Sequence, residues 1–231
     1  MRTVVISLGG STLFESGCVD TAFVKDICRL LVTLKDKARI AVVVGGGRYA
    51  RDYATAIRNA SGNEFLADRA AIFATKANAT VIQAGLGDAA FPRLIQVLDD
   101  AAIALNEGKI AVGCGILEGV STDFDSMLLA ERVQADAVIN ASNTDGVYSE
   151  DPKKNAKASK FKTLTHEQLE TMASASDTRK AGTHFPFDVI ASKLAARSKM
   201  EIHFVKGRNL NDLEKAILGK PHSGTLIKES S

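Results

Sequence analysis

Tryptophan is absent from this 231-residue sequence, and cysteine and proline are scarce, with three and four copies. An odd number of cysteines without paired spacing argues against a zinc site and a disulfide framework, so we interpret Cys18, Cys28 and Cys114 as small apolar residues. No run approaches 18 consecutive apolar residues, which excludes a membrane span, and the first residues lack the features of a signal peptide. We therefore expect a cytoplasmic protein without membrane association.

An excess of one charge sign is also missing, because 29 basic residues stand against 27 acidic ones. A dedicated nucleic-acid-binding protein carries a clear positive excess, so that class is excluded. Hydrophobic residues make up 45% of the chain, which is too many for a disordered protein. A chain of this size buries roughly 70% of its unfolded surface on folding, and it therefore requires no disulfide or structural metal.

Short apolar runs rich in β-branched residues alternate with longer amphipathic or alanine-rich stretches. These runs are too short for helices and are typical of buried strands in a parallel sheet. The predicted strands are Thr3–Leu8, Ile40–Val44, Ile110–Val112, Ala137–Ala141 and Ile202–Val205. Because strands and helices alternate, we predict an α/β fold, a three-layer α/β/α sandwich around a largely parallel sheet, in one domain over 1–231.

Helical spacing and capping residues predict the intervening elements. The periodic or alanine-rich stretches at 23–34, 48–59, 64–84 and 122–133 are predicted helices. Three more helices are predicted from signals at their N-termini: a capping box at Thr165–Gln168, a first-turn proline at Pro186, and Asn211 at the start of the last helix. The polar segment Ser149–Thr163, with five lysines, is either a solvated loop or a lid near nucleotide phosphates.

Three predicted strands lead into glycine-rich turns, at Gly9–Ser11, at Gly45–Gly47, and at Gly113–Gly115 with its continuation to Gly119. Glycine lets other groups approach the backbone closely, and exposed N–H groups in such turns form an anion-binding concavity. Ligands of open α/β sheets bind beyond the carboxyl ends of the strands, where these turns are expected. Each turn alone is explained by a tight strand-to-helix connection, but three together predict phosphate binding.

Two common phosphate-binding motifs do not account for the turns. No stretch supplies the Gly-x-x-x-x-Gly-Lys-Ser/Thr sequence of a Walker A loop. Gly45–Ala50 fits Gly-x-Gly-x-x-Ala, but the acid expected about 20 residues later, Glu64 or Asp68, falls within a helical pattern instead of at a strand end. A dinucleotide-dependent oxidoreductase is therefore disfavoured.

Further motifs surround the glycine turns. The third turn leads into Ser121–Asp123, and the following strand leads into Asn143–Pro152, which reads Asn-x-Asp-Gly-Val-Tyr-x-x-Asp-Pro. Together with Ser7–Ser11 and Val43–Gly47, these motifs resemble those of the amino acid kinase superfamily, and most closely its archaeal-type uridylate kinases. The resemblance covers nearly the whole chain. It is supported at Lys76–Ala79 and Lys180–Gly182.

The resemblance implies phosphoryl transfer from MgATP to UMP, giving UDP and ADP, without a metal ligand from the protein. Asp123 and Arg51 would be catalytic, with Asp123 orienting the groups that hold phosphate. The implied ATP site contains Gly10, Ser11, Gly47, Arg51, Ser142, Asn143, Tyr148 and Asp151. The implied UMP site contains Gly46, Asp68, Ile116, Leu117, Glu118, Gly119, Val120, Ser121 and Thr122. The acceptor side would lie within about 1–135 and the ATP side within about 136–231. The resemblance also implies that the protein assembles as a homohexamer.

The chemistry fits this set of residues. A phosphate oxygen is already deprotonated at neutral pH, so the reaction needs alignment and charge stabilisation but no general base. The four histidines have no ligand spacing, and we interpret them as structural or surface residues. Arg48 and Arg51, at a helix start, are either solvated or bind an external anion. For Asp123 a simple helix cap is the alternative, and for Asp68 a solvated helix position.

Departures from the family pattern leave alternatives open. Ser7 stands where most relatives carry lysine, which favours the archaeal type and leaves the replacing cation unidentified. Glu118 would repel an anionic ligand unless its side chain faces away. Isopentenyl phosphate kinase, or another small-substrate kinase of the family, is the first alternative, although it would want lysine at Ser7 and a histidine in the pocket. A non-catalytic nucleotide- or oxyanion-binding protein of the same fold is the second.

Overall fold

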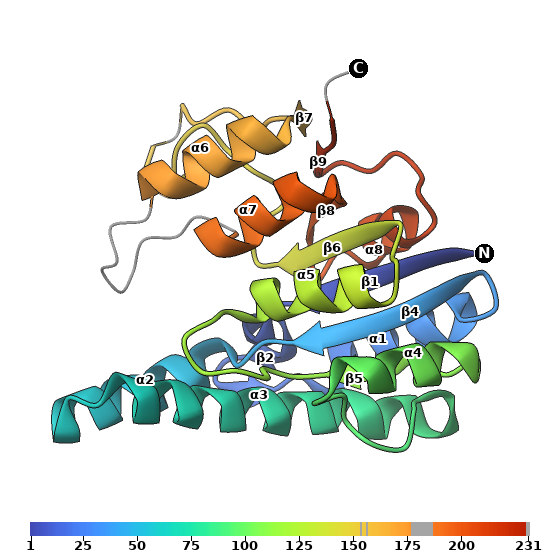
Figure 1. Cartoon of the computed structure of the whole chain (residues 1–231), viewed down its shortest axis with the longest axis horizontal. Helices are drawn as coiled ribbons and strands as arrows, with labels where there is room; N and C mark the ends of the chain where they lie inside the picture. Colours follow the sequence, from blue (N-terminus) through green and yellow to red (C-terminus); the bar gives the residue numbers. More distant parts are fainter. Residues whose placement is uncertain (153, 156, 177–186, 230–231) are drawn as a thin grey trace.

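A seven-stranded sheet organises the computed structural model, which describes residues 1–152, 154–155, 157–176 and 187–229 (Figure 1). The strand order is β5-β4-β1-β6-β8-β9-β7, and pairing is parallel except between β8 and β9. The strands are β1 (Arg2–Leu8), β4 (Ala38–Val44), β5 (Ala111–Gly113), β6 (Ala137–Ser142), β7 (Thr163–Leu164), β8 (Glu201–Lys206) and β9 (Thr225–Ile227). The predicted strands correspond to β1, β4, β5, β6 and β8, and the prediction of a largely parallel sheet is confirmed.

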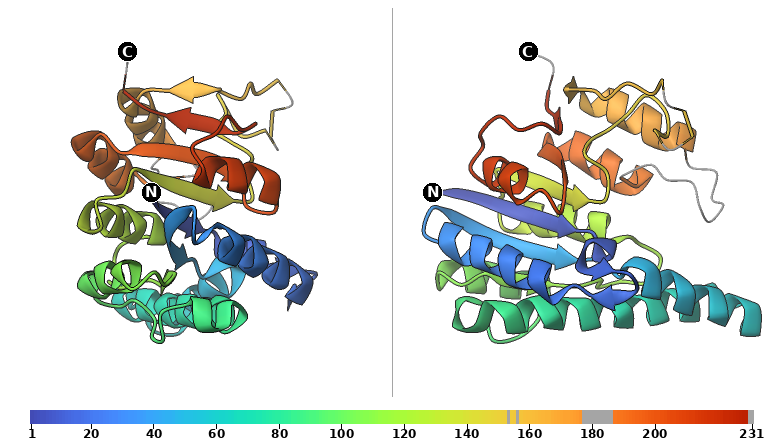
Figure 2. Two further views of the ribbon diagram at one scale, coloured as in Figure 1. Left: turned by 90° about the vertical axis from the view of Figure 1, so that its right-hand side faces the viewer. Right: turned by 180° about the vertical axis from the view of Figure 1, so that it is seen from behind.

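Helices cover both faces of the sheet, as the left view of Figure 2 shows. One face carries α1 (Thr21–Leu34), α3 (Glu64–Leu86) and α8 (Leu210–Ile217). The other carries α4 (Leu98–Asn106), α5 (Thr122–Arg132), α6 (His166–Ser176) and α7 (Val189–Ser198). Helix α2 (Gly47–Ser61) packs against α3, and a small hairpin joins β2 (Phe14–Glu15) to β3 (Cys18–Val19). No helix in the described ranges is both long and apolar enough to cross a membrane.

Alternating side chains of β1 supply both layers of the core. Val4, Ile6 and Leu8 are fully buried against α1, α3 and α8, whereas Val5 is buried in the cluster formed with α4, α5 and α7. This alternation follows from the period of two along a strand. A strand buried on both faces reads as a continuous apolar run, which is why its sequence predicted it.

Some element boundaries differ from the predictions. Thr165 and Gln168 form the predicted capping box, in which each side chain accepts a hydrogen bond from the other residue's backbone N–H. Helix α7 begins after Asp188, whose carboxylate accepts from the Ala191 N–H, so the predicted start near Pro186 is too early. Helix α8 is capped by Asn209 instead of beginning at Asn211. Pro186, like the Lys180–Gly182 motif and His184, lies outside the described residues.

Candidate functional site

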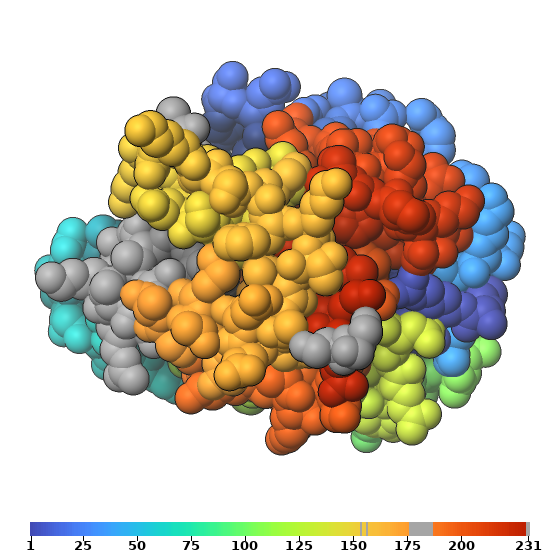
Figure 3. All heavy atoms as spheres, turned by 90° about the horizontal axis from the view of Figure 1, so that it is seen from above, coloured from blue at the N-terminus to red at the C-terminus, as the bar shows by residue number. Residues whose placement is uncertain are grey.

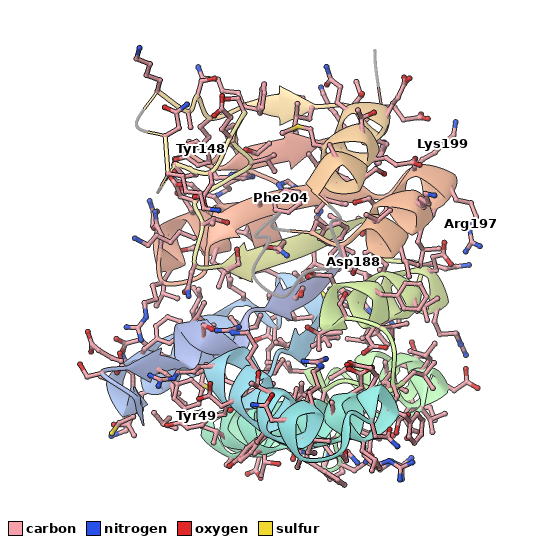
Figure 4. The ribbon with its side chains drawn as sticks, turned by 90° about the vertical axis from the view of Figure 1, so that its left-hand side faces the viewer. Tyr49, Tyr148, Asp188, Arg197, Lys199 and Phe204 are labelled. Atoms are coloured by element: carbon pink, nitrogen blue, oxygen red, sulfur yellow. The ribbon has the colours of Figure 1, made fainter. Side chains whose placement is uncertain are left out.

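The first two glycine turns are in direct backbone contact at the carboxyl ends of β1 and β4. A Cβ atom added at Gly10 would lie 2.0 Å from the Gly45 carbonyl oxygen and 2.5 Å from the Gly47 nitrogen. Gly47 has a φ of +64°, which favours glycine. Because β5 lies beside β4 and parallel to it, the third turn lies at the same carboxyl-end edge of the sheet. Figure 4 views this side of the molecule, with Tyr49 of α2 below and Tyr148 above.

Helix α3 braces two of these turns with side chains that the sequence analysis did not assign. The Asn78 amide donates to the Gly45 carbonyl oxygen at 2.8 Å, and the Thr75 hydroxyl oxygen accepts from the Gly115 N–H at 2.9 Å. Both side chains are buried. Asn78 lies within the Lys76–Ala79 motif, but the sequence alone does not show which of its residues contacts a turn.

Asp123 lies at the start of α5 and faces the end of β1. Its Oδ1 accepts hydrogen bonds from the Ser7 hydroxyl at 2.7 Å and from the Asn140 amide at 2.9 Å. The pKa of Asp123 is raised to about 7, mainly by burial and also by the nearby charge of Asp188, against the lowering effect of the hydrogen bonds from Ser7 and Asn140. The helix cap is Ser121, whose oxygen accepts from the Phe124 N–H, so a simple capping role for Asp123 is wrong. Ser7 contributes a hydroxyl donor here and no charge.

The loop 116–122 after the third turn is fixed by α3. The Asp68 carboxylate accepts from the Gly119 N–H at 3.0 Å, so Asp68 contacts the predicted acceptor loop. The Glu118 carboxylate accepts from Arg69 at 3.1 Å. Hydrogen bonds from its own backbone N–H and from Arg69 hold the pKa of Glu118 below its ordinary value. Its charge is therefore neutralised by a cation, which removes the expected repulsion of an anionic ligand.

The two arginines at the start of α2 differ in their surroundings. Arg48 donates to Asp52 at 3.2 Å, and both side chains are exposed. Arg51 is exposed and forms no salt bridge with any residue in the described ranges. Of the two, Arg51 is the one without an ion pair in the described ranges, and the role that the resemblance implies for it stays a prediction.

Of the predicted ATP-side residues, Ser142 ends β6 and Asn143 follows it, whereas Tyr148 and Asp151 lie in a loop, residues 147–161, whose two arms pair. The Phe161 N–H donates to the Val147 carbonyl at 2.9 Å, and the backbones of Tyr148 and Lys160 form an isolated antiparallel β-bridge. The Tyr148 hydroxyl donates to Asp145 at 2.7 Å, and Lys160 donates to the same carboxylate at 2.8 Å. Residues of this loop and α6, yellow to orange in Figure 3, form the left and central part of the face seen from above, beside the red C-terminal residues. These contacts join residues 147–148 of the loop to residues 160–161.

Ser121 joins the starts of two helices. Its hydroxyl donates to Asp188, the N-cap of α7, while its oxygen accepts from the N–H of Phe124 in α5. Asp188 is labelled in Figure 4, where it lies between the upper and lower parts of this edge. No group of three or more His, Cys, Asp or Glu side chains within the described ranges is arranged to hold a metal ion.

A largely parallel sheet with three glycine turns at its strand ends, next to the half-buried carboxylate of Asp123, defines the class of this protein: an α/β protein whose strand-end turns are suited to phosphate groups. The family model described as amino acid kinase family matches residues 2–206. The chain belongs to the amino acid kinase family.

Relatives align over almost the whole chain. The sequence is 36% identical over 225 residues to a uridylate kinase of Thermococcus gammatolerans, covering 97% of this chain and 99% of the relative. It is 37% identical over 229 residues to a uridylate kinase of Methanoculleus marisnigri, covering 99% and 97%. The crystal structure of uridylate kinase from Archaeoglobus fulgidus has a TM-score of 0.86 and 32% identity, covering 98% of this chain and 100% of that one. The resemblance found in the motifs is confirmed.

Proposed function

We propose that this protein transfers the γ-phosphoryl group of MgATP to the phosphate of UMP, giving UDP and ADP. The observation that carries the proposal is the contact of the first two glycine turns at the sheet edge that also carries the third, next to Asp123, in a chain 36% identical to an enzyme named uridylate kinase. Backbone N–H groups at these turns suit two polyanionic ligands, because they provide donors without bulky side chains.

The proposed mechanism needs no proton-transferring side chain. The attacking UMP phosphate oxygen is already ionised, so catalysis consists of alignment and of stabilising the charge on the transferred group. We propose that Gly10, Ser11 and Gly47 hold the ATP phosphates together with Arg51. Asp123 positions the ends of β1 and β6 through Ser7 and Asn140. Mg²⁺ enters with ATP, as part of that substrate.

We propose that the acceptor site and the donor site lie over different parts of the sheet. UMP would lie over Gly46, Asp68 and the loop 116–122, within about 1–135. The adenosine of ATP would lie against Ser142, Asn143, Tyr148 and Asp151, within about 136–231. The hydrogen bond from the Gly119 N–H to the Asp68 carboxylate supports one acceptor site that includes both, because it joins α3 to the loop 116–122.

The test is a coupled assay of ADP release with MgATP and one of three acceptors: UMP, CMP or isopentenyl phosphate. We expect UMP to stimulate ADP release most strongly, and mass spectrometry to detect UDP in equal amount. Stimulation by isopentenyl phosphate alone would contradict the proposal and identify a different kinase of the family. Tight ATP binding without turnover on any acceptor would identify a non-catalytic nucleotide-binding protein.

We further propose that the protein acts in the cytoplasm as a homohexamer. Large apolar side chains on α2 and α3 support self-association, since Tyr53, Phe65, Leu66 and Phe73 are between 41% and 62% exposed. Light scattering coupled to size-exclusion chromatography tests the assembly, with six times the 24.5 kDa protomer mass as the expected result. Fractionation of cells tests the location.

A further inference from the structure

Asp125 is a buried carboxyl group that the proposed mechanism does not use. It lies on α5 two residues after Asp123, and only 1% of it is exposed. Its Oδ2 accepts a hydrogen bond from the Ile116 N–H at 3.1 Å, whereas Oδ1 has no hydrogen-bond partner in the described part of the chain. A buried carboxylate with an unsatisfied oxygen is destabilising unless a cation pairs with it.

The charges around Asp125 do not compensate for this burial. The neighbouring carboxylate of Asp188 has the same sign, and the nearby Cys114 thiol is neutral and buried. Burial raises the pKa of Asp125 to about 6, which the Ile116 hydrogen bond counteracts and the Asp188 charge reinforces. An apolar residue of similar volume would stabilise this position better, so a role in stability does not account for an acid here. Perturbed buried carboxyls of this kind are concentrated at functional sites.

Asp125 holds the beginning of the proposed acceptor loop. Side chains accept from two backbone N–H groups of this loop and from one just before it: Asp125 from Ile116, Asp68 from Gly119, and Thr75 from Gly115. Thr75 and Asp68 belong to α3, whereas Asp125 belongs to α5. The loop is therefore held from two sides, and Asp125 supplies the link to the helix that also carries Asp123.

We propose that Asp125 is a positioning residue, which orients the loop 116–122 for the phosphate acceptor by holding the Ile116 N–H. The proposal rests on the proposed function for the identity of the acceptor, UMP. A bound anion at this loop needs backbone N–H groups that point in one direction. Fixing Ile116 and Gly119 on either side of the bend determines that direction before the acceptor arrives, which lowers the cost of binding.

The test compares Asp125→Asn with Asp125→Leu. Asparagine keeps an oxygen that accepts from Ile116, whereas leucine has a similar volume and keeps none. We expect Asp125→Leu to raise the KM for UMP about tenfold, the equivalent of one lost hydrogen bond to a charged group. The KM for ATP should remain within about twofold of the wild-type value, and Asp125→Asn should restore the KM for UMP to within about threefold.

Ser126→Ala is the matched control, because the Ser126 hydroxyl is buried on the same helix and donates to the Thr122 carbonyl of that helix. It should leave both KM values unchanged. The melting temperature of Asp125→Leu should equal or exceed that of the wild type. A lower melting temperature with an unaltered KM for UMP, or equal increases in both KM values, would overturn the proposal. Absence of UMP turnover by the wild type would instead contradict the proposed function.

Discussion

At Gly10, backbone atoms of the neighbouring turn occupy the space in which any other residue carries its Cβ. The obstruction is a carbonyl oxygen and a backbone nitrogen, which cannot rotate away as a flexible side chain could. The adjacent Gly9 differs, since a Cβ there would meet its nearest atom at 3.4 Å, an ordinary contact distance. Two neighbouring glycines of one turn are therefore constrained to different degrees.

We predict that Gly10→Ala separates the first two turns and abolishes measurable turnover. The clash should cost about 3 kcal/mol or more. For a chain of this length, that corresponds to a fall in melting temperature of at least about 6 °C. Gly9→Ala is the control and should melt within about 2 °C of the wild type. Equal behaviour of the two variants in thermal denaturation would refute the packing argument.

Asp123 is expected to make stability depend on pH. Its pKa is raised from 3.8 to about 7 by folding, so the folded state binds this proton more tightly than the unfolded chain does. Stability from this group is therefore present at low pH and is lost as pH rises from about 4 towards 7. Asparagine carries no charge at any pH.

We therefore predict that Asp123→Asn is more stable than the wild type at pH 8, by about 1–3 kcal/mol, and nearly equal to it at pH 4.5. Urea denaturation at the two pH values measures the difference. Asp125 titrates in both proteins and cancels in the comparison. A stability difference that is the same at both pH values would show that burial does not raise the pKa of Asp123. Turnover by the variant should fall, because Ser7 and Asn140 lose their charged acceptor.

Among the elements, the three-residue strand β9 also anchors the 147–161 loop. Its Thr225 is fully buried, and the hydroxyl donates to the Phe161 carbonyl at 2.6 Å and accepts from the Val147 N–H at 2.9 Å. One side chain thus joins the two arms of the 147–161 loop to the sheet. The loop carries Tyr148 and Asp151, two residues of the proposed ATP site.

We predict that Thr225→Val loosens this loop without disturbing the strand, since valine keeps the β-branched shape. Loss of the hydrogen bonds should lower the free energy of unfolding by about 1–3 kcal/mol. The KM for ATP should rise several-fold, while the KM for UMP stays unchanged. Thr80→Val is the control, because Thr80 is exposed and its hydroxyl donates to the Lys76 carbonyl within α3. A rise confined to the KM for UMP would contradict the proposed division of the two sites.

Elements with a strong local pattern were predictable, and those defined by distant contacts were not. The apolar runs of β1 and β4 and the glycine turns after them are visible in the sequence because each signal is continuous. Strand β7 has two residues and pairs with residues of β9 that lie 63 positions further along the chain, so no local period indicates it. The start of α7 was misplaced because Pro186 and Asp188 both suit a helix N-terminus, and only the Ala191 contact distinguishes them.

The residues of the candidate site also fall into those that the sequence could predict and those that it could not. Gly10, Gly47 and Asp123 were identified because their residue types and spacing match a family pattern. Thr75, Asn78 and Asp125 contact the turns across 40, 33 and 9 positions, and their types have many ordinary explanations on a helix. Nor does the sequence show that Glu118 is paired with Arg69, which resolves the expected repulsion.

At the scale of the whole molecule, the long helix α3 has two roles. Its inner residues brace the glycine turns, while its outer residues expose Phe65 and Phe73, at 51% and 62%. An apolar surface on an element that supports the site would connect assembly with activity.

We predict that Phe73→Asp reduces the mass of the assembly in light scattering, because a charge is costly inside an apolar interface. Turnover per protomer should fall in parallel, as the turns lose a rigid support. Phe73 contacts Lys76 through its ring, so Lys76→Ala is the control for that local contact. An unchanged mass for Phe73→Asp would exclude this surface from the assembly.

The contact between Thr225 and Phe161 has a consequence for the newborn protein. The two residues are 64 positions apart, and a ribosome adding 5–20 residues per second needs roughly 3–13 s to synthesise the interval. During that time the N-terminal strands and their turns are already available, whereas the 147–161 loop waits for its anchor. The capacity to hold ATP is therefore expected to mature last, after the rest of the nascent chain has taken shape.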